Sequence, residues 1–193
     1  RGFSHSCYSV AADWATKQTV SKQSGETPEK VILSIDGATK TGYAIWRNGA
    51  IVKSGTKQLS RKNGKRLNEY RKWLLDTVVE WQVTNIIAED IYREHNHLMD
   101  KTYKALSQIQ GVTEMASEET HTESEFINPL QVKRYMINGT TCNRATDKQR
   151  MINRVTTLGY NLETPTADDE ADAIGIMLYY LDSHDLPITH PKK

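Results

Sequence analysis

The stretch VILSIDGATKTGYAIWRNGAIVKSG, residues 31–55, decides the fold. Its first six residues form an apolar, β-prone run that ends in Asp36. Two alternating segments then flank Asn48-Gly49, a pair that supplies the two positive-φ positions of a type I′ turn. The stretch therefore predicts three strands, of which the last two, Tyr43–Arg47 and Ala50–Ser54, pair as an antiparallel hairpin.

Beyond residue 55, helices and strands are expected to alternate. Apolar residues recur at helical spacing as far as about Trp81, and the branched run Asn85–Ala88 predicts a strand that ends at Glu89. A second periodic helix precedes a fifth strand at Glu125–Ile127. The apolar positions of these two helices are Leu67, Tyr70, Leu74, Leu75, Val78 and Val79 in the first, and Leu98, Met99, Leu106, Ile109 and Met115 in the second. Because parallel strands need crossover connections, the order predicts an α/β fold with a mixed five-stranded sheet, three strands antiparallel and then two parallel, flanked by helices.

Three helices are expected to follow the fifth strand. The first begins at Asn128-Pro129, because Pro is tolerated at the first helical position. Capping-box patterns begin a second helix at Thr146, which ends at Gly159, and a third at Thr166, which runs through Leu181.

Length and composition restrict the class of protein. The 193 residues include 25 Lys and Arg against 24 Asp and Glu, so the total charge identifies no partner. No apolar run approaches the roughly 20 residues that a membrane span needs. Cys7 and Cys142 are isolated, which favours reduced thiols in the cytoplasm of a bacterium or a phage-infected cell, with an organelle left open.

The chain is expected to contain one folded domain. Residues 1–30 are polar and form an extension, or the remnant of a tag or leader. The domain spans residues 31–185, and residues 186–193 form a basic tail.

Four acidic side chains are expected to meet at one edge of the sheet. Asp36 and Glu89 each follow a buried strand, and the carboxyl ends of parallel neighbours lie where α/β folds bind ligands. Asp169 and Asp172, three residues apart, project from one face at the start of a helix. Converging carboxylates repel one another unless a cation lies between them, and oxygen ligands suit Mg²⁺ or Mn²⁺. Two such ions about 4 Å apart can activate water and stabilise the leaving oxygen of a phosphodiester.

Each acidic residue also has a plainer interpretation. An Asp after a strand is often only a turn residue, and Asp168 and its acidic neighbours can simply complement a helix dipole. His95 and His97 form a His-x-His pair, but a site for a hard cation prefers oxygen ligands. The joint order of the acids favours the metal site.

Four motifs, in order, resemble those of the RuvC family of Holliday-junction resolvases. They are VILSIDGATKTGYAI with Asp36 and Thr41-Gly42-Tyr43, IIAEDIY with Glu89 and Tyr92, PLQVKRY, and TADDEADAIGI with Asp169 and Asp172. The resemblance runs from Val31 to about Asp182 and implies a ribonuclease-H-like fold. It further implies an endonuclease with two Mg²⁺ ions, or Mn²⁺, bound by those four acids.

The same resemblance implies a homodimer that nicks four-way DNA junctions during recombination or repair, because a twofold substrate matches a twofold enzyme. Tyr92 is expected near the junction, stacked on an unpaired base; packing at a strand end is the alternative. The first motif lacks the Pro and extra residues that often follow the Asp in bacterial resolvases. This departure suggests a phage-type member that also accepts forks and flaps.

Basic residues suggest where DNA lies. Lys57, Arg61, Lys62, Lys65, Arg66, Arg71 and Lys72 crowd one segment that only Glu69 opposes. They are expected to contact phosphates, with a solvated helix face as the alternative. The resemblance adds Lys133, Lys148 and Arg150, and the two lysines are candidates to neutralise charge on the phosphate that is cut.

Three other functions remain open. The Asp-Gly-Ala-Thr-Lys-Thr-Gly turn also resembles the phosphate hairpin of actin-like ATPases and sugar kinases, which ATP binding would reveal. A catalytically inactive protein that binds branched DNA would lack cleavage. A four-acid transposase would give strand-transfer products.

Overall fold

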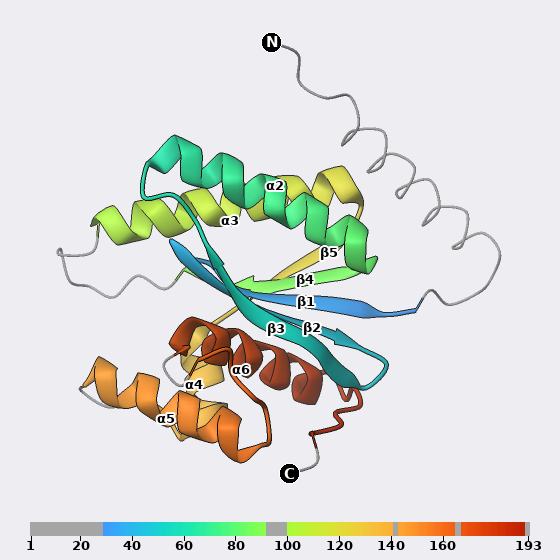
Figure 1. Ribbon diagram of the computed structural model, residues 1–193, viewed down its shortest axis with the longest axis vertical. Helices are drawn as coiled ribbons and strands as arrows, with labels where there is room; N and C mark the ends of the chain where they lie inside the picture. Colours follow the sequence, from blue (N-terminus) through green and yellow to red (C-terminus); the bar gives the residue numbers. More distant parts are fainter. Residues whose placement is uncertain (1–28, 92–99, 141–142, 165–166, 192–193) are drawn as a thin grey trace.

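The computed structural model describes residues 29–91, 100–140, 143–164 and 167–191. Its strands are β1 (Val31–Asp36), β2 (Lys40–Arg47), β3 (Ala50–Gln58), β4 (Asn85–Glu89) and β5 (Glu123–Ile127). Its helices are α2 (Asn63–Trp81), α3 (Asp100–Thr120), α4 (Pro129–Ile137), α5 (Arg144–Thr157) and α6 (Asp168–Ser183). Figure 1 shows a single sheet with α2 and α3 on one face and α4, α5 and α6 on the other.

The strands form one mixed sheet in the order β3-β2-β1-β4-β5. β1 pairs antiparallel with β2, and β2 antiparallel with β3. β1 pairs parallel with β4, and β4 parallel with β5. The predicted α/β sheet, three strands antiparallel and then two parallel, is therefore confirmed.

The hairpin between β2 and β3 turns at the predicted pair. Asn48 has φ 52° and Gly49 has φ 86°, as a type I′ turn requires. The antiparallel register breaks between Ile45 and Trp46, where β2 is irregular. Both strands extend beyond the predicted ends, to Lys40 and Gln58.

The central strand β1 is buried on both faces, and its alternating side chains separate two apolar clusters. Leu33 and Ile35 pack with residues of α2 and α3, whereas Ile32 packs with α4, α5 and α6. Ser34, also buried, donates a 2.8 Å hydrogen bond to the carbonyl of Ala173 in α6. This bond fixes α6 across the strand that carries Asp36.

Helix capping departs from the prediction in α5. Asn128 accepts a hydrogen bond from the amide of Leu130 with Pro129 next in the chain, as expected for α4. The predicted capping box at Thr146 is wrong, because Asn143 caps α5 three residues earlier and accepts from the amides of Ala145 and Thr146. Asn is the better cap, and it extends the helix to Arg144.

The start of α6 also differs from the prediction. Its N-cap is Ala167, which gives no side-chain hydrogen bond, and Thr166 lies outside the described residues. Residues 1–28 of the polar extension and the helical positions Leu98 and Met99 lie outside as well. Met115 is 57% exposed, so a place in the core is excluded for it.

The chain after α6 runs back along the sheet. The indole of Trp46 donates a 3.2 Å hydrogen bond to the carbonyl of Pro187, and the amide of Thr189 donates to Gly49 at 2.6 Å. In the part of the chain that the structure describes, no helix has the length and apolarity that crossing a membrane requires.

Candidate active site

Asp36 and Glu89 end two strands that lie side by side. In the parallel register of β1 and β4, Ile35 is opposite Ala88, so the two acids follow at the same edge of the sheet. Their side chains share a hydrogen bond. The edge is the one at which the sequence predicted a ligand site.

The first turns of α6 add two more acids to this edge. Asp169 and Asp172 both act electrostatically on Asp36. α6 lies unusually close to β2 here, because a Cβ on Gly42 would come within 1.8 Å of the Asp169 carbonyl oxygen. Gly42 therefore lets the helix start approach the sheet. We call Asp36, Glu89, Asp169 and Asp172 the acidic cluster.

Burial and mutual repulsion perturb three members of the cluster. Burial, and then the charges of Glu89, Asp172 and Asp169, raise the pKa of Asp36 well above its ordinary value. Burial also raises the pKa of Glu89, although Lys133 opposes the shift. Burial and the charge of Glu89 raise the pKa of Asp172 to about 7. These acids retain protons where an isolated carboxyl would be ionised.

Lysines balance the outer side of the cluster. Lys40 Nζ lies 3.2 Å from Asp169 Oδ2, with side-chain exposures of 41% and 18%. Lys148 forms an ion pair with Asp168. Burial raises the pKa of Asp168, but the hydrogen bond and the charge of Lys148 outweigh burial and hold this pKa below its ordinary value.

The side chains of the cluster fit a hard cation by chemistry but not by their present arrangement. All four offer oxygen ligands, and burial raises the pKa values of Asp36, Glu89 and Asp172. Within the described ranges, however, no three carboxylate, imidazole or thiol side chains are arranged to hold a metal ion. The hydrogen bond between Asp36 and Glu89 and the ion pair of Asp169 occupy oxygens that a cation would need.

The structure places the predicted basic residues unequally. Lys133 and Lys148 both act electrostatically on Asp172, so the two predicted phosphate neighbours lie near the cluster. Arg150 instead donates to the carbonyls of Ile137 and Gly139 and pairs with Asp147, which ties α5 to the end of α4.

The basic segment at the start of α2 is less free than the sequence suggested. Arg61, Lys62 and Lys65 are exposed, and Arg66 is partly buried. Glu69 is not the single opposing acid, because Arg71 pairs with Glu119 of α3 at 2.7 Å and Lys72 with Asp76 at 2.6 Å. Tyr92, His95 and His97 lie outside the described residues.

Lys40 is the residue that sequence reasoning missed. It lies two positions before Gly42, on the same face of β2, and both residues meet Asp169. The spacing of two residues between Lys40 and Gly42 was available in the sequence, but it points to Asp169 only once it is known that α6 packs on β2. In the sequence alone, Lys40 gives no indication of a contact with Asp169.

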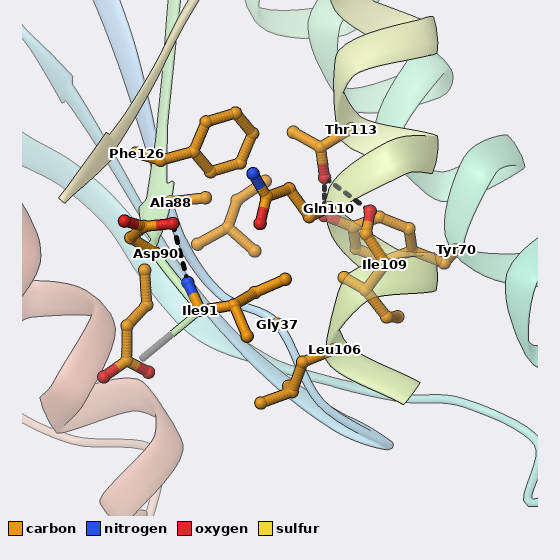
Figure 2. A pocket seen from close by; sticks show the side chains of 12 residues that line it. Gly37, Tyr70, Ala88, Asp90, Ile91, Leu106, Ile109, Gln110, Thr113 and Phe126 are labelled. Atoms are coloured by element: carbon orange, nitrogen blue, oxygen red, sulfur yellow. Dashed lines mark hydrogen bonds between the residues drawn. The ribbon is translucent and has the colours of Figure 1, made fainter. Parts of the chain in front are cut away.

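A small hollow adjoins the acidic cluster between the sheet and α3 (Figure 2). It encloses about 30 Å³ and is lined by Gly37, Glu89, Ile91 and Ile109 among others. Asp90 at its rim accepts a 2.7 Å hydrogen bond from the amide of Ile91. The space holds about one or two water molecules and is too small for a nucleotide.

Solved structures with a similar fold are junction resolvases. RuvC of T. thermophilus in complex with Holliday junction substrate aligns with a TM-score of 0.64 and 16% identity, over 84% of this chain and 99% of that one. The fowlpox virus Holliday junction resolvase gives 0.55 and 12%, over 79% and 99%. The yeast mitochondrial Holliday junction resolvase gives 0.54 and 12%, over 91% and 90%. These likenesses confirm the ribonuclease-H-like fold.

Sequence comparison identifies the family. No curated protein sequence matches the chain. The family model for "Crossover junction endodeoxyribonuclease RuvC", however, matches residues 32–180, which include every member of the acidic cluster. Because this match covers most of the 193 residues, the chain belongs to the RuvC family of crossover junction endodeoxyribonucleases.

Proposed function

We propose that the chain is an endonuclease that depends on Mg²⁺ or Mn²⁺ and hydrolyses phosphodiesters of four-way junctions and other branched DNA. The observation that carries the proposal is the meeting of Asp36, Glu89 and Asp172 from β1, β4 and α6 at one edge of the sheet. Acids so far apart in sequence that are gathered and partly buried at one edge of a sheet, with raised pKa values, are candidates for a functional site. Membership of a nuclease family agrees with this interpretation.

The acidic cluster is proposed to hold two cations. When bound, they would supply an activated water and stabilisation of the leaving oxygen, so no protein nucleophile is required. Before a cation binds, the hydrogen bond between Asp36 and Glu89 must break, and Asp169 must release the amine of Lys40 so that the cation can take its place. The cluster therefore binds a cation only with loss of protons and a turn of these side chains.

Two lysines are proposed to act on the substrate. Lys133 lies close enough to Glu89 and Asp172 to lower the pKa of both, and it can neutralise charge on the phosphate that is cut. Lys148 reaches the same side but is oriented by Asp168. Lys133 lies in α4 and Lys148 in α5, and both helices pack against α6. The positions of the two lysines therefore depend on that packing.

The proposed substrate is branched DNA, and the proposed assembly is a homodimer. The T. thermophilus and fowlpox virus proteins of similar fold were both solved with Holliday junction DNA. A four-way junction has twofold symmetry, so two copies of one active site can nick its strands in pairs.

Cleavage of labelled four-way junction, fork and linear duplex tests the proposal, with Mg²⁺, Mn²⁺ or EDTA. We expect paired nicks in the junction that need the cation and are lost in Glu89→Gln, although that variant still binds. Glu125→Gln is the matched control, because Glu125 is exposed on the adjacent strand β5. Equal cutting of forks would indicate a broader branched-DNA nuclease. If the wild-type protein binds junctions but cuts none with either cation, the inactive DNA-binding alternative is correct.

A further inference from the structure

A larger hollow lies beside the small one, between the β1–β2 turn, α2 and α3. It encloses about 260 Å³, just below the roughly 300 Å³ at which small-molecule sites begin. One wall is apolar and is formed by Ala105, Leu106 and Ile109 of α3. Thr39, Thr102 and Arg66 contribute the polar part, and no acidic residue is among the described residues that line the hollow. An apolar wall with one cation suits a planar ring that carries an anionic group.

Arg66 has unused hydrogen-bonding capacity at this hollow. Its Nη2 donates to Asn63 Oδ1 at 2.6 Å. Among the described residues, its Nε is the one buried side-chain nitrogen or oxygen without a hydrogen-bond partner. A buried N–H is costly to leave unpaired, so such an atom calls for an explanation. A turn of the side chain away from Asn63 would present Nε and a terminal nitrogen together, the fork that binds a phosphate.

The hollow is preformed by short-range contacts of the β1–β2 turn. The Thr39 carbonyl accepts from the amide of Leu59 at 2.9 Å, and Thr41 Oγ1 donates to the Ala38 carbonyl at 2.8 Å. A Cβ on Gly37 would lie 2.8 Å from Ile109 Cγ2, so the turn rests directly on α3. The turn side of the hollow therefore needs little rearrangement, and the change that a ligand requires is the turn of the Arg66 side chain.

The larger hollow lies next to the small one, which reaches the acidic cluster. Leu106 and Ile109 line both hollows, and the smaller one reaches Glu89. Figure 2 shows these two side chains on α3, on the side of Gly37. Ala38 follows Asp36 by two residues. A DNA strand with one phosphate at the cluster can therefore continue along α3 towards Arg66.

We propose that this hollow binds one unstacked nucleotide of the cut strand, next to the phosphodiester that is hydrolysed. The base lies against Ala105, Leu106 and Ile109, and Arg66 binds its phosphate. The inference rests on the proposed function, since it takes branched DNA as the substrate. It adds the surface that receives the nucleotide, with the apolar side of α3 for the base and Arg66 for the phosphate.

Fluorescence of 2-aminopurine tests the proposal, because this base brightens when it leaves the stack. Junctions carry it at each position around the exchange point, and Glu89→Gln is used so that the DNA stays uncut. We expect brightening at one position. Ala105→Phe, which fills the hollow, should abolish the brightening, and Ala105→Leu should reduce it if the Phe variant does not fold.

Junction affinity in EDTA provides the second measurement. Arg66→Gln should weaken binding about tenfold or more, as expected for loss of a charged hydrogen bond. Lys104→Gln is the matched control, since it removes an exposed cation of α3 that does not line the hollow, and it should weaken binding by no more than about threefold.

The results separate this inference from the proposed function. Junctions that are bound and cut without brightening at any position, or with equal brightening in Ala105→Phe, overturn the nucleotide site alone. Equal affinities of Arg66→Gln and Lys104→Gln overturn the role of Arg66. A wild-type protein that binds no junction overturns both the site and the proposed function.

Discussion

Asp172→Asn removes one negative charge from the acidic cluster, and we expect it to stabilise the cation-free protein at high pH. Burial and Glu89 raise the pKa of Asp172 from 3.8 to about 7 in the folded state. Between these pH values the folded state binds more protons than the unfolded state, so the free energy of unfolding falls as pH rises through this window. Asn cannot ionise, so the variant avoids that part of the loss.

The magnitude follows from the shift. A rise of roughly three pKa units corresponds to about 4 kcal/mol at 1.36 kcal/mol per unit, which is an upper limit for Asp172 alone. Asp36 and Glu89 also have raised pKa values and share a hydrogen bond, so the protons belong to the group rather than to one residue. We therefore expect Asp172→Asn to be more stable than the wild-type protein by about 1–2 kcal/mol at pH 8, and nearly equal at pH 4.

Urea unfolding in EDTA from pH 4 to 8 measures the difference. Asp182→Asn is the matched control, since Asp182 is exposed on the same helix, and it should lose stability with pH as the wild-type protein does. Mg²⁺ added at pH 8 should recover stability in the wild-type protein, because the proposed cation site exists only in the folded state. A stability loss as large in Asp172→Asn as in the wild-type protein would refute the reasoning, as would a variant that is less stable at pH 8.

Two further substitutions test the contacts of Asp169. Lys40→Ala should tighten Mg²⁺ binding about two- to fivefold in calorimetry, because an exposed ion pair worth about 0.2–1 kcal/mol no longer competes for the carboxylate of Asp169. Lys53→Ala, which removes an exposed lysine of β3, should leave the Mg²⁺ affinity unchanged. Weaker Mg²⁺ binding by Lys40→Ala would contradict the competition. Gly42→Ala should lower the free energy of unfolding by about 1–3 kcal/mol, since its Cβ would overlap the Asp169 carbonyl. Gly111→Ala, whose Cβ meets open space within α3, should be neutral or stabilising in the same urea unfolding experiment.

Much of the fold could be predicted because its signals are local. Asn48-Gly49 specifies a turn by backbone conformation alone, and the run Val31–Asp36 is a strand of the predicted length. The cap of α5 could not be predicted as easily, because Asn143 and Thr146 both suit an N-cap and only the competition between them decides.

The acidic cluster could be anticipated for a different reason. Asp36 and Glu89 each end an apolar strand, and parallel pairing places such ends together without any knowledge of side chains. Contacts between distant surfaces gave no comparable signal. The ion pair of Lys40 depends on α6 approaching Gly42, and the basic segment of α2 loses Arg71 to Glu119 only because α2 packs on α3.

Without a cation, the negative charge of the acidic cluster is neutralised in two different ways. Asp36 and Asp172 sit deeper and are balanced by retained protons, whereas Asp169 is balanced by Lys40. A cation in the proposed site must therefore release protons on one side and an amine on the other. Its affinity should therefore rise with pH as the protons of Asp36 and Asp172 are lost, including through the range near 7 to which the pKa of Asp172 is raised. Cation binding would thus also free the amine of Lys40, which is engaged with Asp169 in the cation-free protein.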